Sequence, residues 1–276
     1  MVRDELARGA ARLAQAGCDT PRLDAELLLS ECLGVDRAGL VMAGREDVAP
    51  EVAERFESLL ARRAEREPVA YILGRRDFRR LSLAVDRRVL IPRPETELLV
   101  EVGLELPSGW RVADVGTGSG AVALGLKDER PDLEVVGLDV SAEALAVARE
   151  NGARLGLEVQ WVLGDLLGGG DPDEAPTGAY DAVLANLPYV AEGFSLAPEI
   201  ARWEPSDALF AGRDGLDTVR RLLEMVVKRP TVRVLGLEIG FDQADAVVSL
   251  TEAAGFSSVE RRRDLAGCER VIVGRR

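Results

Sequence analysis

The chain has 276 residues, of which 47% are hydrophobic and 30% are charged, a balance typical of a globular protein rather than a disordered one. Its net charge of −13 argues against a surface built to neutralise nucleic-acid phosphates, although it leaves room for a local basic patch. Histidine is absent, which excludes imidazole as a base, a nucleophile or a metal ligand. The three cysteines are scattered without the pairwise spacing of metal ligands, so we predict no metal site.

Two features of the sequence predict where the protein works. No apolar run approaches the ~18 residues that a membrane-spanning helix needs. The opening residues, beginning Met1-Val2-Arg3, lack the apolar core of a signal peptide. We therefore expect a cytoplasmic protein with no membrane partner.

Residues 1–76 are predicted to form a small helical bundle. Pro21 and Pro50 each stand where a helix can begin, because the first turn has no use for a backbone N–H donor. Apolar side chains recur at helical spacing after both prolines. A shorter helix is predicted near residues 36–43.

Beyond Gly74 the spacing of apolar residues changes, and a β-hairpin linker is predicted over residues 77–92. Strand and helix then alternate through residues 93–276, which indicates an α/β domain with a mostly parallel sheet. The last two strands have no helix between them, so we expect an antiparallel pair at one edge. Residues 168–178, rich in glycine and acidic side chains, are predicted to be a loop. The predicted strands are residues 111–115, 135–139, 159–163, 182–185, 232–239, 257–262 and 270–273, and the predicted helices are residues 121–127, 141–155 and 242–254.

A glycine-rich turn follows the first predicted strand of this domain. Glycines there let a ligand approach the backbone, and the next helix offers free N–H donors at its start. The turn also fits the dinucleotide fingerprint, with an acid about 20 residues further on that is suited to binding ribose hydroxyls. It therefore predicts an adenosine-type cofactor, with nicotinamide and S-adenosylmethionine both open. The candidate cofactor residues are Asp114, Gly116, Thr117, Gly118, Ser119, Gly120 and Asp139.

A second acid lies at the end of the third predicted strand, in Gly164-Asp165-Leu166. Asp165 is placed to accept the amino hydrogens of an adenine, and Leu166 to cover its ring. A Gly-Asp pair after a strand is also common in plain turns, so this motif is the weaker of the two.

The motif Asn186-Leu187-Pro188-Tyr189 directly follows the fourth predicted strand, at the sheet edge where α/β proteins bind ligands. The Asn186 amide oxygen and the Leu187 carbonyl offer two acceptors, and Pro188 restricts Leu187 to an extended conformation. Tyr189 adds a flat face. Two acceptors and a flat face suit a planar group bearing NH2, such as a carboxamide or a nucleobase. We predict that these four residues bind the substrate and carry the catalysis.

Taken together, these motifs resemble the amino-methyltransferases, whose usual form of the second motif is Asn-Pro-Pro-Tyr. More narrowly, the chain resembles the release factor glutamine methyltransferase family. The similarity runs in order from the helical N-terminus to the last strand, which makes it far more specific than a glycine-rich loop. The segments that carry it are Pro68–Gly74, Val89–Glu97, Ala211–Leu216, Glu238–Gly240 and Asp264–Gly267.

The resemblance implies a Rossmann-like seven-stranded methyltransferase sheet with a small N-terminal helical-bundle domain. It implies S-adenosylmethionine as the cofactor, with Asn186 contacting it, and class I peptide-chain release factors as the partners. The methylated group would be the side-chain amide of the glutamine in their Gly-Gly-Gln motif. The domain of residues 93–276 would be catalytic. Because every cofactor motif lies after residue 110, and a glutamine on a protein belongs to a large partner, we expect residues 1–76 to dock the release factor. Arg93 and Glu95 are further candidate substrate contacts.

One position departs from the family pattern, because Leu187 stands where proline is usual. The carbonyl acceptor survives, but the backbone is less rigid and gains an N–H group. Three rival functions stay open. An N6-adenine nucleic-acid methyltransferase would bind a similar planar amino group, although the acidic composition leads us to expect no direct nucleic-acid substrate. A nicotinamide oxidoreductase would use the same glycines, and a module that has lost catalysis would keep only the cofactor site.

Overall fold

The computed structural model describes residues 1–168 and 179–276, which form two compact units. The helical unit comprises Met1–Arg75 and Leu196–Trp203, and the sheet unit comprises Arg76–Ser195 and Glu204–Arg276. Of the loop predicted over residues 168–178, all but Gly168 lies outside the described residues. Among the described residues, no helix is both long enough and apolar enough to cross a lipid bilayer.

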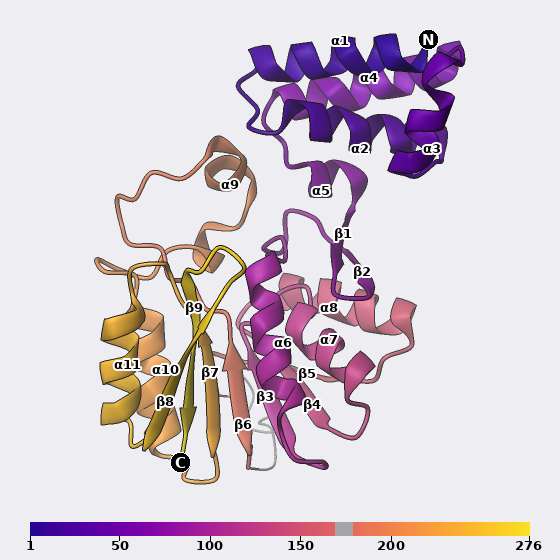
Figure 1. Ribbon diagram of the computed structural model, residues 1–276. Coiled ribbons are helices and arrows are strands. Elements are labelled where there is room, and N and C mark those ends of the chain that lie inside the picture. Colours follow the sequence, from indigo (N-terminus) through magenta and orange to yellow (C-terminus); the bar gives the residue numbers. More distant parts are fainter. Residues whose placement is uncertain (169–178) are drawn as a thin grey trace. The chain divides into compact units, whose positions relative to one another are not determined.

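The five α-helices of Met1–Arg75 pack around one apolar core (Figure 1). Pro21 and Pro50 are the first helical residues of their helices, as their missing N–H groups favour. Phe56 and Leu28 are fully buried in the core. The helices are α1 (Val2–Gln15), α2 (Pro21–Leu33), α3 (Arg37–Met42), α4 (Pro50–Ala64), α5 (Val69–Leu73) and α9 (Pro198–Trp203), with a 3-10 turn at Ala43–Arg45.

Ion pairs hold the distant segment 196–203 within this unit. Arg63 is buried and donates to Asp24 at 2.7 Å and to Glu199, on α9, at 2.9 Å. Arg66 donates to both oxygens of the same Glu199 carboxylate, at 2.7 and 2.6 Å. Bidentate arginine–carboxylate pairs fix geometry as well as supplying energy. The chain that leaves the sheet unit at Ser195 is thus anchored by two arginines of α4 and the turn after it before it returns at Glu204.

The sheet unit contains a seven-stranded sheet in the order β5-β4-β3-β6-β7-β9-β8. Strands β3 to β7 pair in parallel, whereas β9 runs antiparallel to β7, and β8 antiparallel to β9. This confirms the predicted fold class and the antiparallel edge pair. The bounds are β3 (Arg111–Val115), β4 (Glu134–Asp139), β5 (Gln160–Leu163), β6 (Ala182–Ala185), β7 (Val234–Glu238), β8 (Ser258–Arg263) and β9 (Glu269–Arg275).

Helices cover both faces of this sheet (Figure 1). Successive residues of a strand point to opposite faces, so Val112 joins the core under α6 and α7 while Ala113 joins the core under α10 and α11. The central strands are therefore apolar on both faces over most of their length, as parallel strands covered on both sides are. The helices are α6 (Glu97–Leu104), α7 (Ala121–Glu129) and α8 (Ala142–Leu155) on one face, and α10 (Asp217–Val227) and α11 (Ala244–Ala253) on the other.

The hairpin before the sheet is shorter than its apolar pattern suggested. Its strands are β1 (Arg75–Phe78) and β2 (Leu81–Ala84), and the chain then continues as a loop. Val85, Val89 and Ile91 are all buried, but they lie in that loop rather than in a strand. The spacing of buried apolar residues that predicted a strand here is therefore produced by a loop that packs against the domain.

The connections of the sheet place a crevice at its carboxyl edge. From β3 the chain passes through α7 to β4 on one face, whereas from β6 it passes through α10 to β7 on the other face. Because β3 and β6 are neighbours, their loops diverge to opposite faces at this edge. Such a switch point is where open α/β sheets bind ligands.

Candidate active site

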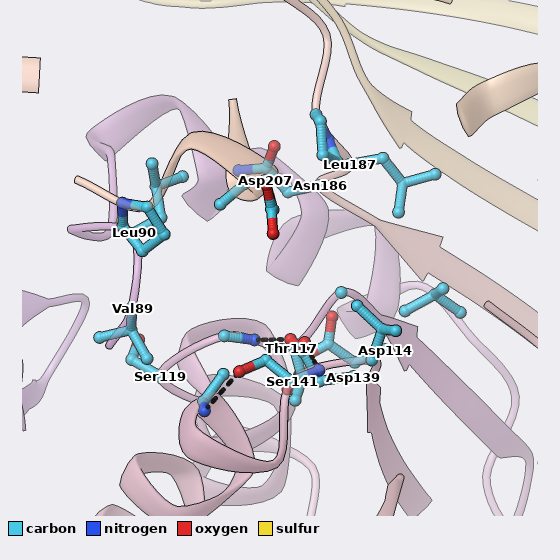
Figure 2. Close-up of a pocket in the computed structure, with 18 of the residues that line it drawn as sticks. Val89, Leu90, Asp114, Thr117, Ser119, Asp139, Ser141, Asn186, Leu187 and Asp207 are labelled. Carbon is cyan, nitrogen blue, oxygen red and sulfur yellow. Dashed lines mark hydrogen bonds between the residues drawn. The ribbon is translucent and has the colours of Figure 1, made fainter. Parts of the chain in front are cut away.

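A pocket of about 400 Å³ opens at this edge of the sheet unit, within the size range of small-molecule sites. Figure 2 shows the residues after β3 and β4 on one side and Asn186 with Leu187, after β6, on the other. Among the described residues, four predicted site residues are not part of this lining: Gly120, Tyr189, Arg93 and Glu95. The predicted residues that do line it are Asp114, Gly116, Thr117, Gly118, Ser119, Asp139, Asp165, Leu166, Asn186, Leu187 and Pro188.

The glycine loop has the backbone conformation that glycine permits. Gly116 and Gly118 have φ of 73° and 55°, in the left-handed region that side chains disfavour. A Cβ at Gly116 would also lie 3.3 Å from the Asn186 carbonyl oxygen. Glycine at this position therefore lets the loop pass close to the Asn186 turn without backbone strain or a tight Cβ contact.

Asp114 anchors the glycine loop through hydrogen bonds. Its side chain is buried, and one carboxylate oxygen accepts from the Thr117 hydroxyl at 2.6 Å and from the Ala123 N–H at 3.0 Å. Burial raises the pKa of Asp114 to about 7, against the opposing effect of these two hydrogen bonds. Its contacts bind the loop to the start of α7, so its main role is to shape the loop.

Asp139 ends β4 and lies across the loop from Asp114. One carboxylate oxygen accepts from the Gly118 N–H and the other from the Ser141 N–H, each at 2.9 Å. Burial raises its pKa, and the hydrogen bonds from the backbone oppose that shift. Each carboxylate oxygen can accept a further hydrogen bond, so the carboxylate is held in place while still able to accept two ligand hydroxyls.

The second predicted acid, Asp165, lies further out. It is exposed and paired with Arg221, and both residues line the pocket. Leu166 beside it is buried and has φ of 56°, a conformation rare for leucine. This backbone places the leucine side chain inward and leaves the acid at the pocket's rim.

Asn186 is oriented by a residue that the sequence did not single out. Its Nδ2 donates to the Thr96 hydroxyl at 3.0 Å, so Oδ1 is the amide atom not used in that contact. Thr96 is buried and also lines the pocket. It lies in the Val89–Glu97 motif, directly after Glu95, the candidate substrate contact predicted from the sequence.

The other end of the motif is held through its backbone. The Tyr189 carbonyl accepts from Gln243 Nε2 at 2.9 Å, and the same amide donates to the Asp214 carbonyl at 3.1 Å. A Cβ on Gly215 would lie 2.1 Å from the Tyr189 carbonyl oxygen, so only glycine fits there. The Ala211–Leu216 segment and the start of α11 thus support the turn rather than contact the pocket at these points.

Burial, and next the nearby Glu238, raise the pKa of the Tyr189 hydroxyl to about 12, which keeps it neutral near pH 7.

Arg93 and Glu95 lie beside the pocket rather than in its lining. Arg93 pairs with the buried Glu204, which also accepts from the Ile91 N–H at 3.1 Å. This pairing uses one terminal nitrogen of the guanidinium, Nη2. Their role toward a substrate stays a prediction.

Comparison with known proteins shows the family. A family model described as the PrmC N-terminal domain matches residues 4–74, and one described as a methyltransferase domain matches residues 112–203. The chain is 42% identical over 276 residues to the release factor glutamine methyltransferase of Rhodospirillum rubrum, covering 98% of this chain and 84% of that protein. The enzyme of the same name from Deinococcus radiodurans is 39% identical over 281 residues, covering 100% and 98%.

Among solved structures, the hMettl16 catalytic domain superposes with a TM-score of 0.58 at 16% identity, covering 79% of this chain and 81% of that one. That likeness shows the fold alone. The sheet, the glycine loop and the matching family model together make this protein an S-adenosylmethionine-dependent methyltransferase. Within that class, identity to curated relatives over nearly the whole chain shows that it belongs to the release factor glutamine methyltransferase family.

Proposed function

We propose that the protein transfers a methyl group from S-adenosylmethionine to the side-chain amide nitrogen of the glutamine in the Gly-Gly-Gln motif of class I release factors, in the cytoplasm. The observation that carries the proposal is the fixed Asn186 amide, whose Nδ2 is bound to Thr96 so that Oδ1 can serve the pocket as an acceptor. A substrate carboxamide has the two N–H donors that this acceptor and a neighbouring carbonyl require.

The residues of the pocket fit the cofactor. Glycines in left-handed conformation leave the space that a Cβ would fill, and α7 begins directly after them. The Asp139 carboxylate is suited to two ribose hydroxyls, and Leu166 supplies an apolar surface for an adenine ring. We infer that these residues hold S-adenosylmethionine, which supplies an electrophilic methyl group when it is bound.

The chain's own contribution is to align a poor nucleophile. An amide nitrogen shares its lone pair with its carbonyl, so it attacks only when held in a favourable geometry. Accepting both amide hydrogens, at Asn186 Oδ1 and the Leu187 carbonyl, would point the lone pair toward the methyl donor and stabilise positive charge as it develops. The surplus proton can leave after transfer, once the nitrogen has become acidic. This chain supplies no imidazole to the reaction, because it has no histidine.

We also propose that the helical unit docks the release factor away from the methylated loop. The pocket and its lining residues lie in the sheet unit, so the helical unit adds nothing to that lining. A glutamine on a protein belongs to a large partner that must be oriented, and remote contacts supply orientation as well as affinity.

A labelled-methyl assay tests the main proposal. We expect label on intact release factor, located by mass spectrometry on the glutamine, and none when that glutamine is replaced by alanine. The Asn186→Ala variant should lose at least ~10²-fold in single-turnover rate, as when a preorganised polar contact is removed. Label on adenine-containing DNA in place of the release factor would instead support the adenine methyltransferase.

A further inference from the structure

Glu238 is a buried carboxylate with no role in the chemistry described so far. It ends β7, and the register of β6 with β7 pairs Ala185 with Leu237, so Asn186 and Glu238 follow at the ends of neighbouring strands. Glu238 is 2% exposed and is not part of the pocket lining. Within residues 1–168 and 179–276, its Oε2 has no hydrogen-bond partner. A carboxylate buried with so little compensation opposes folding, which calls for a reason outside stability.

Thr96 connects this carboxylate to the active-site amide. Its hydroxyl lies close enough to Glu238 to lower the pKa of that carboxyl, and it accepts a hydrogen bond from Asn186 Nδ2 at 3.0 Å. An ionised carboxylate can only accept, and the Thr96 oxygen already accepts from Asn186 Nδ2, so its single hydroxyl proton is the one left to turn toward Glu238. The lone pairs of that oxygen then face Asn186, and only the NH2 end of the amide can occupy the position opposite them.

We propose that Glu238 is a positioning residue, which acts through the Thr96 hydroxyl to hold the Asn186 carboxamide with Oδ1 available to the substrate amide. The inference rests on the proposed function, because it assigns the direction of the amide that accepts from glutamine. With a neutral group in place of the carboxylate, Thr96 is free to donate its proton to Asn186 Oδ1. The amide can then turn over and present NH2 to a substrate that itself has only N–H groups to offer.

The test compares Glu238→Gln, Thr96→Val, Thr96→Ser and the double variant Glu238→Gln/Thr96→Val in the full chain, with release factor as substrate. Because alignment rather than binding is lost, we expect kcat to fall about tenfold in the first two. The KM for release factor and the S-adenosylmethionine affinity should change less than about twofold. Thr96→Ser keeps the hydroxyl and should retain most of kcat. The double variant should be no slower than the slower single one, since both changes break the same connection.

Thr251→Val is the matched control, because it removes a buried hydroxyl that bonds only within α11, to the Val247 carbonyl at 2.7 Å. Its kcat should equal that of the parent. Any one of three results would overturn the positioning role. These are additive losses of kcat in the double variant, an unchanged kcat in Glu238→Gln, and equal losses of kcat in Thr96→Ser and Thr96→Val. If Glu238→Gln fails to fold, the pH profile of kcat decides: a rise through about pH 7 should be present in the parent and absent in Thr96→Val, and a rise that persists in Thr96→Val would overturn the role of Glu238. If the parent does not methylate release factor, the proposed function itself is wrong. If the parent methylates release factor and the variants do so equally well, only the positioning role of Glu238 is wrong.

Discussion

Asp139 illustrates how one side chain serves both the fold and the ligand. Its two oxygens bind N–H groups from the glycine loop and from the start of α8, so the carboxylate positions both loops and faces the pocket between them. Removing it therefore affects cofactor binding in two ways, through the lost hydroxyl contacts and through a looser loop.

We predict that Asp139→Ala weakens S-adenosylmethionine binding by ~1–3 kcal/mol, the scale of lost charge-assisted hydrogen bonds. Asp165→Ala should weaken it less, because Asp165 is exposed at the rim and already paired with Arg221. Isothermal calorimetry on both folded variants measures the difference. Equal losses, or none at Asp139, would show that the ribose assignment is wrong.

Glu238 gives the rate a predictable pH dependence. Burial, and next the nearby Glu95 charge, raise its pKa to about 7, while Thr96, Arg270 and Arg93 act to lower it. The ionised form is the one that fixes the Thr96 proton, so kcat should rise as pH increases through about 7. In Glu238→Gln this rise should be missing. Asp114 titrates in the same range, but its contacts lie in the cofactor loop, so its effect belongs in cofactor affinity. A rise in kcat that persists in Glu238→Gln would contradict the assignment.

The same group acts on stability with the opposite sign. Because the folded-state pKa is raised from 4.5 to about 7, its favourable contribution is complete below 4.5 and is lost as pH rises through about 7. A shift of this size corresponds to roughly 3 kcal/mol between the two limits. Glu238→Gln should therefore gain stability relative to the parent as pH rises over this range, in the same interval in which its relative activity falls. Thermal unfolding at a series of pH values measures the gain.

At the scale of elements, α9 depends on charges rather than on apolar area. It has six residues, none of them buried, and Glu199 makes its contacts with Arg63 and Arg66. Although burial favours the neutral form, the hydrogen bonds from Arg66 and Arg63 hold the pKa of Glu199 below its usual value. The stabilising contribution is thus present above 4.5 and is lost as pH falls through the lower folded-state pKa.

We predict that Glu199→Gln destabilises the protein by ~1–3 kcal/mol at neutral pH, since it leaves the buried Arg63 without one of its two carboxylate partners. Amide hydrogens of residues 196–203 should exchange faster in this variant. The difference in stability from the parent should vanish in acid. Glu252→Gln, an exposed change on α11, is the control and should leave both measurements unaltered. A loss of stability that stays constant down to acid pH would show that charge is not the cause.

The elements that the sequence predicted are those whose pattern is local. The strands of the sheet were predicted correctly, because a strand that is covered on both faces must be an apolar run. The glycine loop was predicted correctly, because its tight turn requires glycines. Helix α10 was not named, although Val219, Leu222, Leu223 and Val226 carry a clear helical spacing. By contrast, α9 is too short to show a period. Thr96, Gln243 and Glu238 were not predicted as supports of the Asn186 turn, because their roles arise only when distant segments meet.

At the scale of the whole molecule, the proposed docking role of the helical unit can be tested in the full chain. We predict that binding of a release factor with alanine in place of its reactive glutamine slows amide hydrogen exchange in helices of Met1–Arg75. Remote docking does not need the reactive side chain, so this protection should persist without methylation. A Gly-Gly-Gln peptide should protect only residues around the pocket. Protection confined to the sheet unit with the intact partner would contradict the docking role.

The passage of residues 196–203 through the helical unit also limits how that unit can have been exchanged during evolution. Three chain crossings, after Arg75, Ser195 and Trp203, join the two units. Recombination at the single junction near Arg75 would give a hybrid whose α9 faces arginines from another lineage. Such a hybrid should be stable only if the donor unit supplies partners for Glu199. A viable chimera would therefore exchange Met1–Arg75 and Leu196–Trp203 together, and inheritance of the two segments should be coupled although more than a hundred residues separate them in the gene.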